Sequence, residues 1–446
     1  MRIAHIAAHT GGGVGSVLGS FFQISASLGV ANDLFCLDSC KSNFADLTGL
    51  GSAHDGLALE PTRPFIGDLD QHDMIVIHYW NHPLMAKFLV EADFPAARIV
   101  VWSHNSGLFE PHVIPSYLFQ LASRVLFSSL CSYSSPNLQY RIHSSPEKFG
   151  SVHSTHVLDE FLKIGLQRGI RGDARRLLYV GTVSDSKLHP QSAEIFAHLS
   201  KVGFDVQVVG GPDHRALEQR VSDLGGEIEV IGPVSHVQDF YRNADIFVYP
   251  LRREHYGTGE QVILEAMASG LPVVAFDNPA ESTILSSGGG TLVATVSDYV
   301  QAVKTLQLHS DLYGETSAVG QRRARQEFSA ARMTETFLGH LSDVMKQEKR
   351  VPASSARQVR GLDELAMYAL NSLFDGDEVV RDMIANPKDA PNLMFSRIER
   401  FLRNPCERPR WLSKTKSTPR HYLQYFPDSA GLLALADEMA VVEDHT

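Results

Sequence analysis

Cysteine is scarce in this sequence, with four residues in 446. Cys36, Cys40, Cys131 and Cys406 are too few and too scattered to form a disulfide framework in a chain of this length. Cys36 and Cys40 are not followed by a second cysteine or histidine pair at the spacing of a zinc site. We therefore expect a protein of a reducing cytoplasm, without a structural zinc ion.

Long apolar runs are also missing. No stretch reaches the roughly 18 apolar residues that a membrane-spanning helix needs. Residues 1–9 form a short strand-like run without the apolar length or the cleavage site of a signal peptide. We expect a cytoplasmic protein that is soluble, or peripheral at the inner face of the membrane.

An excess of positive charge is absent as well. The chain has 40 Lys and Arg residues against 51 Asp and Glu residues, and its formal net charge is -11. A nucleic-acid partner normally needs a basic face, so this balance argues against one. With 43% hydrophobic and 20% charged residues, the composition is that of a globular protein. The length favours two domains plus an accessory segment.

Two common nucleotide-binding motifs are missing or incomplete. The chain has no Walker sequence, which excludes an ordinary P-loop ATPase. Gly11-Gly-Gly-Val-Gly-Ser16 approaches a dinucleotide fingerprint, with Asp38 as the ribose acid, but the third glycine is missing. This disfavours a nicotinamide-dependent oxidoreductase. Asp68-Leu-Asp70 mimics a metal-binding Asp-x-Asp, but its polar surroundings indicate a turn.

The chain does contain a regular alternation of strand-like and helix-like segments. In the first half, strands are expected at residues 3–8, 33–37, 74–78, 98–102, 126–129 and 149–152. In the second half, they are expected at residues 177–180, 204–209, 228–231, 246–249, 273–276 and 291–293. The alternation predicts an α/β protein with two doubly wound parallel sheets, whose ligands lie at the carboxyl ends of strands.

The strand signal is lost over residues 156–172, where we place a domain boundary. The expected domains are residues 1–165, residues 166–348 and a mainly helical, partly basic extension at residues 349–446. The first helix is expected at residues 16–28, with Ser16 as its cap after a flexible turn at residues 11–15. In the extension, helices are expected at residues 362–373 and 393–402. Its basic run at residues 408–420 offers a contact surface for a membrane or a protein partner.

Residues 256–275 combine a glycine-broken loop, a short helix and a buried strand. Gly257 and Gly259 permit positive φ and a close approach of a ligand to the backbone. The N–H groups of the following helix favour an anion, with phosphate as the obvious candidate. Glu265 lies at the edge of the apolar arc of this helix, where the pattern fits a solvated glutamate as well as a functional one.

Five segments of the second half follow one another in the order and spacing of a known family. They are Tyr179-Val-Gly-Thr-Val-Ser-Asp-Ser-Lys187, Val209-Gly-Gly-Pro212, Ile231-Gly-Pro-Val234, Ala244-Asp-Ile-Phe-Val-Tyr-Pro250 and Leu264-Glu-Ala-Met-Ala-Ser-Gly-Leu-Pro-Val-Val274. With weaker matches at Gly12-Gly-Val-Gly15 and His104, about residues 1–345 resemble the retaining GT-B glycosyltransferases of family 4. The resemblance implies two facing Rossmann-like domains and a nucleotide-diphosphate sugar as substrate, with a UDP-sugar favoured. It implies neither a cofactor nor a metal.

The resemblance also implies roles for individual residues. Lys187 would neutralise the diphosphate of the donor, Glu265 would hold the ribose hydroxyls, and His104 would lie near the donor sugar. These roles agree with the need of a diphosphate leaving group for fixed cations and N–H dipoles. The expected catalytic residues are His104, Lys187 and Glu260. The expected donor-binding residues are Gly12, Gly13, Lys187, Gly257, Thr258, Gly259, Glu260, Gln261 and Glu265.

Two positions depart from the family pattern. The first acid of its Glu-x7-Glu motif falls on Gly257, and the arginine that usually follows the glycine of the lysine segment is Thr182. Glu260 or Glu254 would replace the acid, and a similar Gly-x-Glu-Gln variant in some family members favours Glu260. The candidates for the missing cation are Arg252, Arg253 and His189.

We therefore expect a retaining, metal-independent hexosyltransferase that acts on the hydroxyl of a sugar, lipid-linked or protein acceptor. The acceptor would lie against the N-terminal domain, near Trp80, Trp102, Asn81 and Asn105. Three alternatives stay open: a catalytically degenerate protein that binds a nucleotide sugar or stabilises a partner, a pseudo-glycosyltransferase, and a nucleotide-sugar epimerase.

Overall fold

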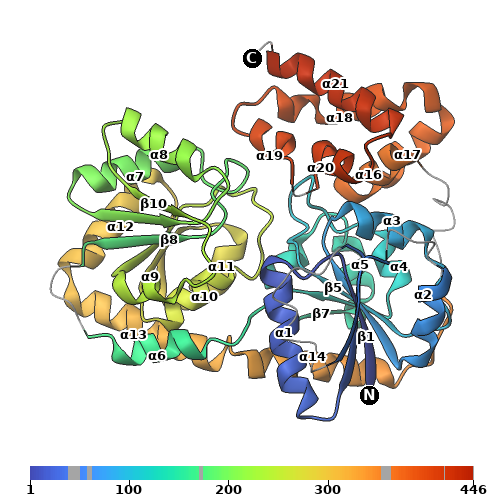
Figure 1. Ribbon diagram of the computed structural model, residues 1–446, viewed down its shortest axis with the longest axis horizontal. Coiled ribbons are helices and arrows are strands. Elements are labelled where there is room, and N and C mark those ends of the chain that lie inside the picture. The colour runs from blue at the N-terminus through green and yellow to red at the C-terminus, as the bar shows by residue number, and fades with distance from the viewer. Residues whose placement is uncertain (39–50, 58–62, 170–173, 353–362, 416, 445–446) are drawn as a thin grey trace. The chain divides into compact units, whose positions relative to one another are not determined.

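The computed structural model describes residues 1–38, 51–57, 63–169, 174–352, 363–415 and 417–444 (Figure 1). The chain divides into two compact units. The first unit consists of Met1–Ser154, Tyr256–Thr258 and Met333–Thr446, and the second of Thr155–His255 and Gly259–Arg332. Each unit contains one parallel sheet, and the units are described separately below.

The sheet of the first unit has, among the described residues, seven parallel strands in the order β3-β2-β1-β4-β5-β6-β7. The strands are β1 (Arg2–Ala7), β2 (Ala31–Cys36), β3 (Gly51–His54), β4 (Met74–Tyr79), β5 (Ile99–Ser103), β6 (Arg124–Phe127) and β7 (Phe149–Ser151). Strand β4 is buried along its whole length, as expected for a sheet that is covered on both faces. The strand β3 was not predicted because Gly-Ser-Ala-His shows no apolar alternation.

The sheet of the second unit has, within the described part of the chain, six parallel strands in the order β10-β9-β8-β11-β12-β13. They are β8 (Arg176–Val180), β9 (Asp205–Val209), β10 (Glu229–Gly232), β11 (Ile246–Tyr249), β12 (Val273–Phe276) and β13 (Gly290–Val293). All the predicted strands of both halves are confirmed, with ends that differ by at most two residues. In each sheet the order reverses next to the first strand, between β1 and β4 and between β8 and β11. Ligands of open α/β sheets bind at such switch points.

Helices cover both sheets. Those of the first unit before its C-terminal part are α1 (Gly12–Ala26), α2 (Arg63–Asp68), α3 (Pro83–Glu91), α4 (Tyr117–Leu121) and α5 (Gln139–Ser144). Those of the second unit are α6 (Asp159–Gln167), α7 (Ser192–Lys201), α8 (His214–Asp223), α9 (Gln238–Asn243), α10 (Gln261–Ala268), α11 (Pro279–Leu285), α12 (Val296–Leu308) and α13 (Ser310–Gln326). Helix α14 (Ala330–Met345) follows, and its Phe337 packs on Phe21 and Trp102 of the first unit.

One local prediction, the start of the first helix, was wrong. Helix α1 begins at Gly12, four residues before the expected Ser16 cap, so the glycines form its first turn instead of a free turn. Gly15 is required within this turn by close packing, because a Cβ at this position would lie 1.9 Å from the carbonyl oxygen of Thr10. The segment of residues 156–172, where we place the domain boundary, contains helix α6.

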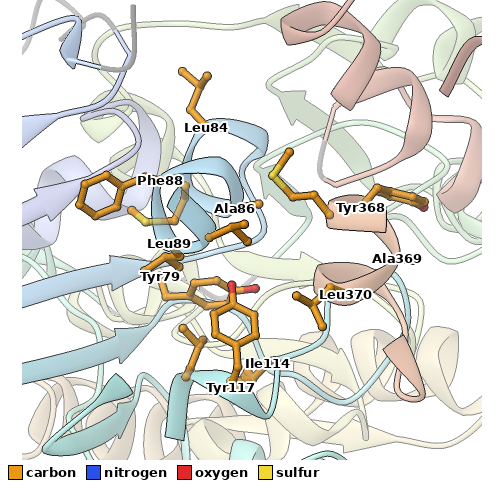
Figure 2. Packing of buried hydrophobic residues seen from close by; sticks show 14 of the residues in the cluster. Tyr79, Leu84, Ala86, Phe88, Leu89, Ile114, Tyr117, Tyr368, Ala369 and Leu370 are labelled. Carbon is orange, nitrogen blue, oxygen red and sulfur yellow. The ribbon is translucent and has the colours of Figure 1, made fainter. Parts of the chain in front are cut away.

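The C-terminal extension is helical, as predicted. Its helices are α16 (Glu364–Ser372), α17 (Gly376–Ala385), α18 (Ala390–Leu402), α19 (Arg408–Leu412), α20 (Pro419–Tyr425) and α21 (Ala430–Asp444). They share one hydrophobic core with the first sheet and helix α3. Figure 2 shows Tyr368 and Leu370 of α16 opposite Leu89 of α3 and Tyr117 of α4. The extension is thus an integral part of the first unit.

The basic run of the extension is only partly a surface feature. Arg410 is buried and donates hydrogen bonds to the carbonyl oxygen of Glu110 and to the Glu407 carboxylate. Arg420 donates to the carbonyl oxygen of Leu412. These arginines therefore stabilise the fold, which weakens the interpretation of the whole run as a surface for an anionic partner. Within the described ranges, no helix has both the length and the apolar character needed to cross a membrane.

Candidate active site

The expected lysine and acid meet at the switch point of the second sheet. Lys187 lies in the loop after β8, and Glu260 lies in the loop after the neighbouring strand β11. The Nζ atom of Lys187 is 3.2 Å from Oε2 of Glu260, and the two side chains are only 10% and 4% exposed. A buried cation and a buried carboxylate are thus paired where this class of sheet binds its ligands.

Three further side chains surround Glu260. The hydroxyl of Tyr249 donates to Oε2 of Glu260, and Nδ1 of His255 lies 3.7 Å from Oε1. Burial opposes ionisation of Glu260, but Lys187, His255 and Tyr249 outweigh it and hold its pKa below the ordinary value. Likewise burial lowers the pKa of His255, but the Glu281 carboxylate, 3.0 Å from Nε2, raises it above the ordinary value. The site therefore alternates positive and negative groups.

The other candidates for the missing acid and the missing cation contact other partners. The Glu254 side chain is 31% exposed and lies 3.6 Å from Nε of Arg252, whose guanidinium also donates to the carbonyl oxygen of Asp185. His189 stacks on Phe276 with ring centroids 4.4 Å apart, and burial lowers its pKa. His189 is therefore neutral at neutral pH and does not replace the missing cation. The carboxylate next to Lys187 is Glu260.

Glu265 is not a solvated glutamate. It projects from α10 and is 12% exposed, with Oε1 2.9 Å from Nε2 of His156 and Oε2 accepting a hydrogen bond of 2.7 Å from the hydroxyl of Tyr241. Tyr241 and His156 were not predicted, because they are 24 and 109 residues away in the chain and no local pattern connects them to Glu265. Two donors orient this carboxylate at the helix that follows the candidate phosphate loop.

The remaining predicted residues of the loop are divided between the units. Gly259, Glu260 and Gln261 belong to the second unit, and Gly257 and Thr258 to the first. Thr258 donates a long hydrogen bond of 3.5 Å to the carbonyl oxygen of His104. Gly12 and Gly13 open α1, and Gly12 has the left-handed φ of 65° that favours glycine.

His104 ends a chain of three histidines that cross the first sheet. Its Nε2 lies 3.0 Å from Nδ1 of His78, and Nε2 of His78 lies 3.0 Å from Nδ1 of His5. At the far end, Nε2 of His5 is 3.0 Å from Oδ1 of Asn32, while the Asn32 amide donates to Ser25. Since Oδ1 only accepts, each ring carries its proton on Nε2. This order places a fixed proton on Nε2 of His104.

The histidine chain also makes the first unit sensitive to acid. Burial lowers the pKa of His5 and of His104 to about 3, and that of His78 well below its usual value. A histidine with a lowered folded pKa takes up a proton on unfolding, so its stabilising contribution is present above the unfolded pKa of about 6.5 and is lost as the pH falls towards the folded value. The first unit is therefore expected to lose about 1.4 kcal/mol of unfolding free energy per pH unit for each of these histidines.

Tryptophan fluorescence measures this effect, because Trp80, Trp102 and Trp411 all belong to the first unit. Unfolding midpoints measured between about pH 7 and pH 4 should fall with pH. The fall should be less steep in His5→Gln, and unchanged in His143→Gln, whose exposed side chain lies on α5. A midpoint that stays constant over this window would contradict the assignment of neutral, buried rings.

Three of the four residues expected at the acceptor are structural. Trp102 is fully buried, and Asn81 and Asn105 are buried and hydrogen-bonded to each other and to the carbonyl oxygen of Val113. Trp80 is partly exposed.

A cavity of about 740 Å³ opens in the second unit at the amino ends of β8, β9 and β10. This edge of the sheet is opposite to Lys187 and Glu260, so the cavity is not part of their site.

Comparison with known proteins shows which family the central region of the chain resembles. Residues 174–309 match the family model described as glycosyl transferases group 1. This region, which we call the group 1 domain, is similar to the group 1 glycosyltransferases. The group 1 domain contains Lys187, Glu260 and Glu265. It also contains Tyr241, the unpredicted partner of Glu265.

Two curated relatives are similar in sequence to part of this chain. One is the phosphatidyl-myo-inositol mannosyltransferase of Mycolicibacterium smegmatis, 28% identical over 241 residues, which are 51% of this chain and 59% of that protein. The other is the lipopolysaccharide core biosynthesis mannosyltransferase LpsB of Rhizobium meliloti, 40% identical over 74 residues, 16% of this chain and 20% of that protein. The matches span at most about three fifths of these relatives.

Solved structures show the fold. A glycosyltransferase from Rickettsia africae has a TM-score of 0.59 at 14% identity, covering 78% of this chain and 99% of that one. Anabaena HepE, in complex with UDP and glucose, has a TM-score of 0.59 at 15% identity, covering 77% and 99%. The chain thus combines a group 1 domain with the GT-B glycosyltransferase fold.

Proposed function

We propose that the chain is a retaining, metal-independent glycosyltransferase that moves a hexosyl unit from a nucleotide-diphosphate donor to an acceptor hydroxyl. The observation that carries this proposal is the buried pair of Lys187 and Glu260 at the β8/β11 switch point of a group 1 domain. A lysine there can stabilise the charge that develops on a departing diphosphate, together with the N–H groups at the start of α10.

In the proposed reaction, the bond between the sugar C1 and the diphosphate oxygen breaks while the acceptor oxygen attacks from the same face. The acceptor proton passes to the departing diphosphate. Lys187 stabilises the leaving group, Glu260 contacts the sugar, and Glu265 holds the ribose. His104 orients the sugar, and the Gly12 and Gly13 amides, with Gly257, Thr258, Gly259 and Gln261, line the donor.

The donor and acceptor are proposed by class. One curated relative is named as a lipopolysaccharide core biosynthesis mannosyltransferase and the other as a phosphatidyl-myo-inositol mannosyltransferase, which supports a glycoconjugate acceptor and a mannose donor. Anabaena HepE was solved with UDP and glucose, which supports a UDP-sugar. The replacement of the family acid by Gly257 favours one alternative, a degenerate protein that binds a nucleotide sugar without turning it over.

The test is to incubate the full chain with UDP-, GDP-, ADP- and dTDP-sugars, with and without glycoconjugate acceptors. Binding and the release of nucleoside diphosphate are both measured. Release that depends on acceptor supports the transferase, and binding without release supports the degenerate protein. Conversion of the donor without acceptor would indicate an epimerase, a product that joins non-sugar partners would indicate a pseudo-glycosyltransferase, and absence of all binding contradicts the proposal.

The ribose contact of Glu265 gives a separate prediction. Wild-type protein is expected to bind UDP, or the diphosphate that the screen selects, about 10- to 100-fold more tightly than its 2′-deoxy analogue, because hydrogen bonds to a charged group contribute about 1.5–3 kcal/mol. Glu265→Ala should weaken the ribonucleotide and bind both nucleotides alike in calorimetric titrations. Tyr241→Phe keeps the carboxylate and should keep the preference for ribose. A full preference for ribose in Glu265→Ala would remove Glu265 from the site.

A further inference from the structure

The first sheet has its own switch point, and unusual side chains gather there. His9 follows β1, Asp38 follows β2, and Trp80 and His82 follow β4, so all four lie at the carboxyl ends of adjacent strands. The ring centroids of His9 and Trp80 are 5.1 Å apart, and those of Trp80 and His82 are 4.7 Å apart. This edge is where an open α/β sheet binds a ligand.

Helix α20 of the C-terminal extension brings two more side chains to this edge. The His421 ring stacks on Trp80 with centroids 6.3 Å apart, and the Tyr425 ring lies 4.8 Å from that of His82. Residues from the two ends of the chain therefore form one cluster, which we call the switch-point cluster: His9, Asp38, Trp80, His82, His421 and Tyr425.

The hydrogen bonds of the cluster run in one direction, from His82 through Tyr425 to Asp38. The Leu84 backbone N–H donates to Nδ1 of His82, so the His82 proton lies on Nε2, 3.1 Å from the hydroxyl of Tyr425. That hydroxyl in turn donates to Oδ2 of Asp38 at 2.9 Å. The Tyr425 hydroxyl and the Asp38 carboxylate are thereby held side by side.

The position of α20 is set by its own anchors. Thr418 caps the helix by accepting a hydrogen bond from the His421 backbone N–H, and Ser417 donates to the carbonyl oxygen of Asn81. Tyr422, one turn further on, is fully buried and packs against Tyr368 with ring centroids 5.0 Å apart. The helix thus cannot move without breaking the core that it shares with the sheet.

The cluster has a buried side and a partly exposed side. His82 and His421 are buried, whereas His9, Asp38, Trp80 and Tyr425 are partly exposed. An aromatic surface beside a carboxylate and a phenol offers apolar contact to the C–H face of a sugar ring and strong acceptors to its hydroxyls.

We propose that the switch-point cluster binds the saccharide of the acceptor, and that the C-terminal extension determines acceptor specificity by supplying Tyr425 and His421. The proposal rests on the proposed transferase function and goes beyond it. It gives the last hundred residues a role at the site. The Asp38 carboxylate and the Tyr425 hydroxyl oxygen accept hydrogen bonds from acceptor hydroxyls, and Trp80 supplies the apolar surface.

Tryptophan fluorescence tests this directly. The structure describes all three tryptophans, and Trp102 and Trp411 are fully buried while Trp80 is partly exposed. Titration of the full chain with methyl α-mannoside and methyl α-glucoside should change the emission, and Trp80→Phe should abolish the change. Tyr425→Phe should weaken binding about three- to tenfold, the effect of one lost hydrogen bond. Tyr140→Phe, the same change at an exposed tyrosine of α5, should bind as the wild type.

Nucleotide binding, measured on the same variants, separates this inference from the proposed function. If the nucleotide binds and transfer proceeds, but Tyr425→Phe and Trp80→Phe retain the wild-type KM for the acceptor, the switch-point cluster is not the acceptor site. If the glycosides change Trp80 emission but no nucleotide binds, the saccharide site stands and the transferase proposal fails. A raised acceptor KM with unchanged nucleotide affinity in both variants supports the inference.

Discussion

Lys187→Ala is expected to lower kcat/KM for sugar transfer by about 100- to 1000-fold, the range found when a group that stabilises transition-state charge is removed. Lys187 is buried at the carboxyl end of β8, and its ammonium group lies 3.2 Å from Glu260. Low solvent exposure strengthens its interaction with a departing diphosphate. The measurement is release of nucleoside diphosphate under steady-state conditions, with the donor that the screen selects.

The control for this variant must separate lost catalysis from lost stability. Removing Lys187 leaves the Glu260 carboxylate buried without its cation, which destabilises the fold by itself. The double variant Lys187→Met/Glu260→Gln should recover part of the unfolding midpoint but none of the activity. Lys163→Ala removes an exposed lysine of α6 and should change neither. Wild-type kcat/KM in Lys187→Ala would remove Lys187 from the mechanism.

Much of the second unit could be predicted because its signals are local. Buried parallel strands are continuous apolar runs, and Gly270, with φ of 73°, ends α10 where the sequence places a glycine. Lys187 and Glu260 are 73 residues apart, but both follow strands that the apolar pattern identifies. The topology of a doubly wound sheet then brings these loops together.

The histidine chain could not be predicted, because strand register alone assembles it. His5 pairs with Val76, and His78 pairs with Ala7 and with Trp102, so the three rings come from different strands and the loop that follows. The local sequence around His5 and His78 reads as an ordinary buried strand. The partners of Glu265 escaped prediction because no local pattern connects them to it, and His156 precedes α6 in a segment without strand signal.

The sequence of helix α16 contained a sign that the extension is buried, but the basic residues elsewhere in the extension obscured it. Residues 365–372 of α16 are buried all round, and a helix that is apolar on every side belongs in a core. The basic run at residues 408–420 suggested a contact surface for a membrane or a protein partner instead. Arg410 shows why that inference was incomplete, because its charge is satisfied by Glu407 and a backbone carbonyl inside the fold.

Glu260→Gln is expected to lower kcat by about 10- to 100-fold, the effect of a lost charge-assisted hydrogen bond of about 1.5–3 kcal/mol. Glu254→Gln should leave kcat unchanged, because that side chain is 31% exposed and faces Arg252. The two variants make the same chemical change six residues apart, so each serves as the control of the other. Steady-state kinetics with varied donor measures both, and a larger loss in Glu254→Gln would assign the missing acid to Glu254.

The role of Glu260 can be inferred from whether Glu260→Gln changes the affinity for the nucleoside diphosphate or only kcat. If Glu260 acted only by holding Lys187, its replacement would change the affinity for the nucleoside diphosphate, which lacks the transferred hexose, as well as kcat. If Glu260 contacts the sugar in the transition state, diphosphate affinity stays at the wild-type value while kcat falls. We expect the second result. Calorimetric titration of Glu260→Gln with the diphosphate alone, compared with kcat for the complete donor, decides whether Glu260 has taken over the role of the acid missing at Gly257.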